Sequence, residues 1–306
     1  MSAQTDPIYV ECRIRGALED VWRLTQTPDL HERWDLRFTS IRYLLRPDDS
    51  QPQRFLYSTR IGFGIKIEGE GESMGERGNA SGERTSALKF WSDDPKSLIR
   101  RGSGYWKYVP VGDGVRFITG YDYEVRFGPA GRLFDRVVFR PLLGWATAWS
   151  FDRLRLWIER SLDPGVAARL AGIHALARAG VGFVWLYHGL IPKLIFHHAD
   201  EYRLVAEAGL PESLWTSVVN AIGLAEIALG LIVLLNWRSR WPLGLTIILM
   251  ALALLGVAIN SPSCIVSAFN PLTLNVLLAL LALVGLIAGS EIPSAAKCLR
   301  RPEPAP

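Results

Sequence analysis

The sequence predicts two parts of different fold class: an α+β domain, in which an antiparallel sheet surrounds a long carboxyl-terminal helix, and an all-α four-transmembrane-helix bundle. Three observations predict this division. Hydrophobic side chains alternate with a period of two in the first half of the chain. A long amphipathic helical pattern follows Gly131. Four apolar runs, each long enough to cross a hydrocarbon layer, then occupy most of the second half.

Composition supports two parts that suit different solvents. Only 8 of the 34 Lys and Arg residues and 7 of the 30 Asp and Glu residues lie in residues 176–306. A single uniformly soluble domain is therefore excluded. The net charge of +4 is small and mixed with acids, so nucleic-acid binding is not expected. Cys12, Cys264 and Cys298 form no C-x-x-C pair, which argues against a disulfide scaffold or a thiol–disulfide oxidoreductase.

Alternation of apolar and polar residues predicts the strands. Its clearest examples are Ile8–Ile14 and Val115–Phe127, where one face suits a core and the other suits water. Shorter runs of the same kind occupy Arg54–Ile61, Thr85–Trp91 and Gly104–Val109, and two short helices are expected at Leu18–Thr25 and Leu30–Phe38. The segment 69–82 is rich in Gly and Glu, so we expect a mobile hairpin tip there.

The helical pattern after Gly131 runs to Arg160, and Pro141 is expected to bend or break it. A curved sheet around one helix cannot fill its own concavity, so a cavity for a hydrophobic small molecule is predicted. Aromatic and hydroxyl side chains expected to line it are Tyr57, Trp91, Trp106, Thr119, Tyr121, Tyr123 and Trp145. The alternative is that the same residues are ordinary core residues.

Four spans are predicted in the second half, at Leu176–Phe196, Leu214–Asn236, Trp241–Asn260 and Pro271–Ser290. Basic residues occur in the loop between the second and third spans and after the fourth, whereas the loop 261–270 has no charge. Since basic residues favour the cytoplasmic side, an inner-membrane, multi-pass protein with both ends in the cytoplasm is expected.

The predicted domain boundaries follow from these patterns. Residues 1–163 form the soluble ligand-binding domain, 164–175 a basic interfacial linker, 176–292 the four-span membrane domain, and 293–306 a cytoplasmic proline-rich tail. The basic stretch Arg153–Arg169 is expected to lie on the anionic inner leaflet.

Two family resemblances support this division. The first half resembles the SRPBCC (START-like, polyketide-cyclase) helix-grip superfamily through Ala17, Val21-Trp22, Leu24, Pro28-Asp29 and Trp34-Asp35. This resemblance implies a cavity for a hydrophobic small molecule or lipid, without implying one chemistry. The second half resembles the DoxX-like family through Arg178-x3-Gly182, His188-Gly189-x3-Lys193 and Gly223-x2-Glu226-x3-Gly230. Relatives in that family are linked to quinone, thiosulfate or oxidative-stress functions.

The intramembrane polar residues Arg178, His188, Lys193 and Glu226 are the candidates for chemistry in the membrane half. Glu226 lies near the middle of its span, where an ionised carboxylate is costly unless it is paired. His188 is predicted at a similar depth, so we expect a buried hydrogen-bonded His188–Glu226 pair that holds a headgroup or relays a proton. The alternative is a purely structural contact between helices. Arg178 and Lys193 are expected to snorkel or to receive anionic lipid headgroups.

No metal site is predicted. His197, His198, Asp200 and Glu201 lie close in sequence, but neighbouring side chains on one helix diverge, and interfacial loop residues are the better interpretation.

Three functional hypotheses remain open at this point. The favoured one is a non-enzymatic or accessory protein that binds a lipid, isoprenoid or quinone in the soluble cavity and exchanges it with the bundle. The second is a membrane subunit of a quinone-linked oxidoreductase, with His188 and Glu226 at a quinone cofactor. The third is a ligand sensor that regulates a membrane partner. Expected partners are membrane lipids, a hydrophobic small molecule, and either a membrane redox partner or a second copy of the chain.

Overall fold

The computed structural model describes residues 6–46, 48, 50–62 and 64–302. Its contacts divide the chain into two compact units, which are considered separately. The first unit contains the chain up to Ala167 together with the segment from Pro293 onward, and the second unit contains Ala168–Ile292.

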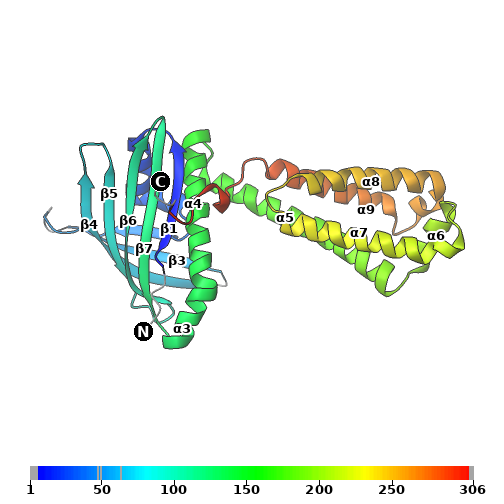
Figure 1. The fold of residues 1–306 in the computed structure, drawn as a ribbon, viewed down its shortest axis with the longest axis horizontal. Helices are drawn as coiled ribbons and strands as arrows, with labels where there is room; N and C mark the ends of the chain where they lie inside the picture. The colour runs from blue at the N-terminus through cyan, green and yellow to red at the C-terminus, as the bar shows by residue number, and fades with distance from the viewer. Residues whose placement is uncertain (1–5, 47, 49, 63, 303–306) are drawn as a thin grey trace. The chain divides into compact units, whose positions relative to one another are not determined.

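The first unit contains a seven-stranded antiparallel sheet with helices on one face, as predicted (Figure 1). The strands lie in the order β1-β7-β6-β5-β4-β3-β2. Their bounds are β1 (Ile8–Arg15), β2 (Ser40–Tyr43), β3 (Arg54–Ile61), β4 (Ile65–Gly78), β5 (Arg84–Trp91), β6 (Ile99–Val111) and β7 (Gly114–Val125). The helices are α1 (Leu18–Gln26), α2 (Pro28–Trp34), α3 (Gly128–Phe134) and α4 (Arg140–Arg160), with a π-helical turn at Asp135–Phe139. The arrangement is that of a helix-grip fold.

Strand β4 corrects the expectation of a mobile tip at residues 69–82. Its glycines Gly69 and Gly71 lie on the inner face of the sheet, beneath aromatic rings of the neighbouring strand β3. A Cβ atom on Gly69 would lie 2.3 Å from Cζ of Tyr57, and one on Gly71 would lie 2.2 Å from Cζ of Phe55. The rings replace the missing side chains, so a glycine-rich segment forms a regular strand here.

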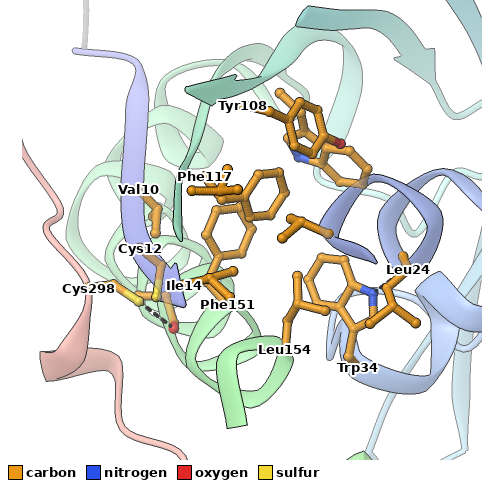
Figure 2. Close-up of a cluster of buried hydrophobic side chains, with 14 of the residues drawn as sticks. Val10, Cys12, Ile14, Leu24, Trp34, Tyr108, Phe117, Phe151, Leu154 and Cys298 are labelled. Atoms are coloured by element: carbon orange, nitrogen blue, oxygen red, sulfur yellow. Dashed lines mark hydrogen bonds between the residues drawn. The ribbon is translucent and has the colours of Figure 1, made fainter. Parts of the chain in front are cut away.

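The core of the first unit lies between the inner face of the sheet and α4 (Figure 2). The rings of Phe117 and Phe151 stack with centroids 4.4 Å apart, which joins β7 to α4. The fully buried indole of Trp34 donates a 2.9 Å hydrogen bond from Nε1 to the carbonyl oxygen of Leu24. Pro141 lies in the first turn of α4, directly after the π-helical turn, so the helix is interrupted where the sequence predicts.

The sequence suggested a separate tail after the last apolar helix. In the structure this segment belongs to the first unit. The backbone N–H groups of Glu11 and Leu299 each donate a 2.9 Å hydrogen bond to the other residue's carbonyl oxygen. The backbone N–H of Ser294 donates to Oδ2 of Asp152 at 2.8 Å. Ala295 and Cys298 are buried in the same hydrophobic core as β1.

The second unit is helical, and within the described residues four helices are long and apolar enough to cross a membrane. These candidate spans are Pro164–Ile195, Glu212–Leu235, Trp241–Asn260 and Pro271–Ala288. They correspond to α5 (Pro164–His188) with the π-helical turn η2 (Gly189–Ile195), α7 (Trp215–Leu235), α8 (Trp241–Asn260) and α9 (Pro271–Ala288). A short helix, α6 (Ala199–Glu207), separates the first two. Because α5 begins at Pro164, the predicted linker 164–175 is helical.

The pairing of Leu299 with Glu11 restricts the topology. Glu11 and Leu299 belong to one folded unit, so a membrane that the helices between them cross must have both residues on the same side. An even number of spans must therefore separate β1 from Leu299, and the four apolar helices satisfy this requirement.

Candidate functional site

The candidate site is a group of three charged side chains in the membrane half: Lys193, Glu201 and Glu226. The Lys193 ammonium lies 3.1 Å from Oε1 of Glu201 and 3.1 Å from Oε2 of Glu226. The side chains are only 8%, 20% and 17% exposed, respectively. Lys193 therefore connects an acid on α6, outside the candidate spans, with an acid in the middle of α7.

A close helix crossing places Lys193 beside Glu226. A Cβ atom on Gly189 would lie 2.5 Å from the carbonyl oxygen of Gly223, and one on Gly230 would lie 3.1 Å from that of Gly182. Both contacts join the first span to α7, so two glycines on each segment allow the backbones to approach. Lys193 follows Gly189 by about one helical turn, on the same side of the helix. The Cβ atom of Lys193 lies 3.0 Å from the position that a Cβ atom on Gly223 would occupy.

Glu226 keeps one unused hydrogen-bonding position. Its Oε2 atom is buried and accepts no hydrogen bond from the part of the chain that the structure describes. The Lys193 ammonium contributes its charge at 3.1 Å, but its direction is unsuitable for a hydrogen bond to this atom. An acceptor of this kind in an apolar bundle is costly and suits a hydroxyl or other donor on a ligand.

The predicted His188–Glu226 hydrogen bond is not formed. Among the contacts of the described residues, the partner of Glu226 is Lys193. His188 is partly buried, and its ring lies edge-on to that of Tyr187, with centroids 5.9 Å apart. The sequence argument rested on the position of each residue along its span, which does not fix the direction in which each side chain points.

Arg178 has a structural role, which corrects the expectation that it receives lipid headgroups. Its side chain is fully buried, and Nη1 donates to the carbonyl oxygens of Val233 at 2.5 Å and Asn236 at 3.0 Å. Nη2 donates to the carbonyl oxygen of Ser239. The guanidinium thus satisfies carbonyl groups at the end of α7 that have no partner within the helix.

His174 fixes the direction of the same guanidinium. Nε of Arg178 donates to Nε2 of His174 at 2.9 Å, so Nε2 carries no proton. Nδ1 of His174 must then be the protonated nitrogen, and it donates to the carbonyl oxygen of Gly285 at 2.7 Å. This neutral histidine joins the first span to α9.

Four of the predicted cavity-lining residues are buried in the soluble core. The hydroxyl groups of Tyr121 and Thr147 lie 2.8 Å apart, and that of Tyr123 donates to Oδ1 of Asp135 at 2.7 Å. Thr119 donates to the carbonyl oxygen of Tyr105, and Trp106 packs in the aromatic core. These contacts fit the alternative of core residues. Burial raises the pKa values of Tyr121 and Tyr123, so both phenols stay protonated.

Tyr57 and Trp91 line a different hollow. A pocket of about 860 Å³ lies against β2, β3 and β4, with the ends of β5 and its following loop. Charged residues form a large part of its lining and include Arg42, Arg60, Lys66, Glu68 and Glu70. The strand register places Phe90 opposite Gly71 on the inner face, so Trp91 points to the outer face and cannot line an inner cavity. Burial raises the pKa of Tyr57 to about 12.

Trp145 belongs to an exposed apolar surface on the first half of the long helix. Its side chain is 42% exposed and stacks on Trp149. Other large apolar residues exposed on the same part of the chain are Leu133, Phe134, Val137, Val138 and Leu142. The periodic stripe predicted to face the sheet is thus partly turned outward.

The basic stretch Arg153–Arg169 is only partly available to lipid. Arg153 is buried and donates from Nε to the carbonyl oxygen of Pro164 at 2.8 Å. Arg155 lies 2.7 Å from Asp152 and 2.9 Å from Glu159. Arg160 and Arg169 remain exposed.

Sequence reasoning missed a buried charged cluster around Asp35. Arg37 donates to both carboxylate oxygens of Asp35, from Nε at 2.9 Å and Nη2 at 2.6 Å, and Nε2 of His31 lies 3.0 Å away. Burial alone would raise the pKa of Asp35, but the Arg37 charge and the His31 contact hold it below its usual range. The sequence did contain a signal for this cluster. His31 and Asp35 are four residues apart, as neighbours on a helix are, and Arg37 follows Asp35 by two residues.

A metal centre has no support in the described residues, among which no three His, Cys, Asp or Glu side chains gather to hold an ion. His197 instead contacts Oδ1 of Asn220 through Nε2 at 3.1 Å, and Nδ1 of His198 lies 3.5 Å from Asp200.

Comparison with known proteins matches both halves. Residues 182–284 match the DoxX-like family. The uncharacterized membrane protein YndG of Bacillus subtilis (strain 168) is 44% identical over 239 residues, which cover 77% of this chain and 79% of YndG. The chain belongs to the YndG family, with a DoxX-like membrane domain. It is thus a membrane protein with several apolar helices, joined to a domain that has a helix-grip fold.

Solved structures similar to the chain cover its first half. TTHA0849 from Thermus thermophilus is 20% identical, covers 50% of this chain and 99% of its own length, and has a TM-score of 0.37. A STAR-related lipid transfer protein from Xanthomonas axonopodis is 18% identical, covers 49% of this chain and 84% of its own length, and has a TM-score of 0.38.

Proposed function

We propose that this DoxX-like membrane protein binds a hydrophobic small molecule whose polar headgroup lies at Lys193 and Glu226. The molecule is a lipid or an isoprenoid with a hydrogen-bond donor on its headgroup, or a quinone in its reduced, quinol form. The supporting observation is the buried Oε2 atom of Glu226, which is ion-paired with the Lys193 ammonium at 3.1 Å but accepts no well-directed hydrogen bond from the described residues. A ligand hydroxyl or quinol would supply that donor, and the apolar part of the molecule would lie between the helices.

The charges around Glu226 favour a neutral or weakly polar headgroup. Lys193 is already shared between Glu201 and Glu226, at 3.1 Å from each. A strongly anionic group would compete with both carboxylates for the same ammonium. A hydroxyl group, in contrast, donates to Glu226 without displacing Lys193 and leaves the charge balance of the site unchanged.

The soluble domain is proposed to act with the bundle on the same molecule. Its exposed apolar surface at Leu133–Trp145 would allow a hydrophobic compound to pass between the membrane and the domain. The basic loop with Arg238 and Arg240 lies on the same side as this domain, which supports a cytoplasmic location. We therefore place the domain in the cytoplasm and assign the protein an accessory, binding role in the inner membrane.

The experiment is mass spectrometry of small molecules extracted from the full chain purified in a mild detergent. The wild type is compared with Glu226→Gln, which keeps the size of the side chain, and with Glu212→Gln, an exposed acid at the beginning of the same span. We expect one hydrophobic compound to be enriched over bulk lipid in the wild type and in Glu212→Gln. A hydrogen bond to a charged group contributes about 1.5–3 kcal/mol, so Glu226→Gln should retain roughly ten- to a hundredfold less.

Equal retention by all three proteins would contradict the proposal, as would the absence of any enriched compound. The thermal midpoint of Glu226→Gln should stay close to that of the wild type, because Lys193 keeps Glu201 as a partner. This measurement separates loss of the ligand from loss of the fold.

A further inference from the structure

We propose that Cys12 and Cys298 form a reversible disulfide that ties the carboxyl-terminal segment to β1 under oxidising conditions. The two residues are far apart in the sequence but belong to the same folded unit. Figure 2 shows their side chains side by side between β1 and the returning segment.

The backbone register brings the two cysteines opposite each other. Glu11 and Leu299 exchange both backbone hydrogen bonds at 2.9 Å, which makes them a hydrogen-bonded antiparallel pair. The next pair along the two segments is Cys12 and Cys298. They face each other as a non-hydrogen-bonded pair, in which Cα atoms are about 4.5 Å apart. Disulfides join Cα atoms separated by about 4.4–6.8 Å, so this position accepts a bridge with little backbone movement.

The side chains also point to the same place. Both cysteines are buried in the core that contains Val10 and Ile14. The thiol of Cys298 donates to the carbonyl oxygen of Ala148 at 3.2 Å, and the thiol of Cys12 interacts with that of Cys298. Cys264 offers a comparison, because its sulfur lies 3.2 Å from Nη2 of Arg203 in the other unit and it has no cysteine beside it among the described residues.

Oxidation of this pair should require the carboxyl-terminal segment to detach. The Cys298 thiol and burial both raise the pKa of Cys12, so the reactive thiolate is scarce while the segment is docked. The segment is held by the pair with Glu11 and by the hydrogen bond from Ser294 to Asp152. A segment held by so few hydrogen bonds opens more easily than a full strand. Its opening would expose Cys298 to an oxidant.

The reaction is balanced with a hydroperoxide as the oxidant. The thiolate of one cysteine attacks the peroxide oxygen, which gives a sulfenic acid and releases hydroxide, or water after protonation. When the segment docks again, the second thiol displaces water from the sulfenic acid and the S–S bond forms. With hydrogen peroxide, two thiols thus lose two electrons and two protons, and two molecules of water result. A low-molecular-weight thiol reverses the step by thiol–disulfide exchange.

The test uses the full chain in mild detergent, exposed to hydrogen peroxide under native conditions and then alkylated and digested with trypsin. Cleavage after Lys297 and Arg300 isolates Cys298 in a three-residue peptide, so a link to the peptide that contains Cys12 is easily recognised by mass. We expect this linked pair in the wild type and in Cys264→Ser, and its loss in Cys12→Ser and Cys298→Ser. The thermal midpoint of the wild type should rise on oxidation and return on reduction.

The proposal is overturned if peroxide leaves both thiols unlinked, or converts them to sulfinic acids without the bridge. It is also overturned if linked peptides that contain Cys264 form as fast as the Cys12–Cys298 pair, since this would indicate random pairing. An unchanged thermal midpoint despite complete linkage would remove the claim that the bridge fixes the segment. None of these results bears on ligand binding at Glu226.

Discussion

Two cations in the membrane half, Lys193 and Arg178, have different roles because their neighbours differ. Arg178 is fully buried and donates to three backbone carbonyl groups and to His174, which fixes the end of α7. Lys193 is shared by two carboxylates, one of which retains an open acceptor position. The sequence identified both residues as polar groups in the membrane. It could not assign their partners, because a hydropathy pattern gives depth along a helix but not the direction of each side chain.

In the soluble domain, the cluster of His31, Asp35 and Arg37 predicts a pH dependence of stability. Burial lowers the pKa of His31 below its usual value of 6.5, although Asp35 opposes the shift. Below about pH 6.5 the unfolded chain therefore binds more protons than the folded chain, and the stability falls as the pH falls. We expect a lower midpoint of thermal unfolding near pH 5.5 than near pH 7.5.

The His31→Gln variant is the matched control for this pH effect. Its amide nitrogen can still donate to Asp35, but the side chain does not titrate. The difference in the free energy of unfolding between pH 7.5 and pH 5.5 should therefore be smaller in the variant, by about 1 kcal/mol or less. An equal pH difference in both proteins would show that another group is responsible.

At the scale of elements, the crossing of the first span and α7 depends on glycine. A methyl group on Gly189 would approach the carbonyl oxygen of Gly223 to 2.5 Å, and one on Gly223 would approach that of Gly189 to 2.8 Å. We therefore expect Gly189→Ala and Gly223→Ala to separate the two helices and to destabilise the bundle by about 1–3 kcal/mol. The same change should weaken the contact between Lys193 and Glu226.

The chain provides controls within the same bundle. Gly244 and Gly256 lie in α8, and a Cβ atom on either would meet nothing within 4 Å. Alanine is the better helix former, so these variants should be neutral or slightly stabilising. Thermal unfolding of the full chain in one detergent compares the four proteins. A loss of stability in all four, or in none, would contradict the assigned helix crossing.

The elements that the sequence predicts well are those with a strong period. The last three spans and the strands β1 and β7 fall close to their expected ranges, because long runs of apolar or alternating residues leave few alternatives. The first span begins at Pro164, twelve residues before its predicted start. Strand β4 was missed because its glycines indicate a loop, whereas rings supplied by Tyr57 and Phe55 on the neighbouring strand cover them. That compensation depends on strand pairing, which a local pattern does not contain.

At the scale of the whole molecule, the two ends of the chain fold together. The sequence predicted that both ends lie on one side of the membrane, from the basic residues of the loops. It did not predict that the last segment pairs with β1, because a single bridge of two hydrogen bonds has no periodic signal. The contact between Glu11 and Leu299 therefore supports the same topology as the distribution of basic residues. All four candidate spans lie between these two paired residues in the sequence.

The account therefore depends most on a cytoplasmic soluble domain that includes both ends of the chain. Single cysteines at the exposed positions Ala268 and Ala296, each in a chain whose native cysteines are replaced by serine, test this claim directly. A membrane-impermeant thiol reagent applied to intact cells should label Ala268→Cys, and should label Ala296→Cys only after the cells are permeabilised. Labelling of Ala296→Cys in intact cells, with Ala268→Cys protected, would contradict the account.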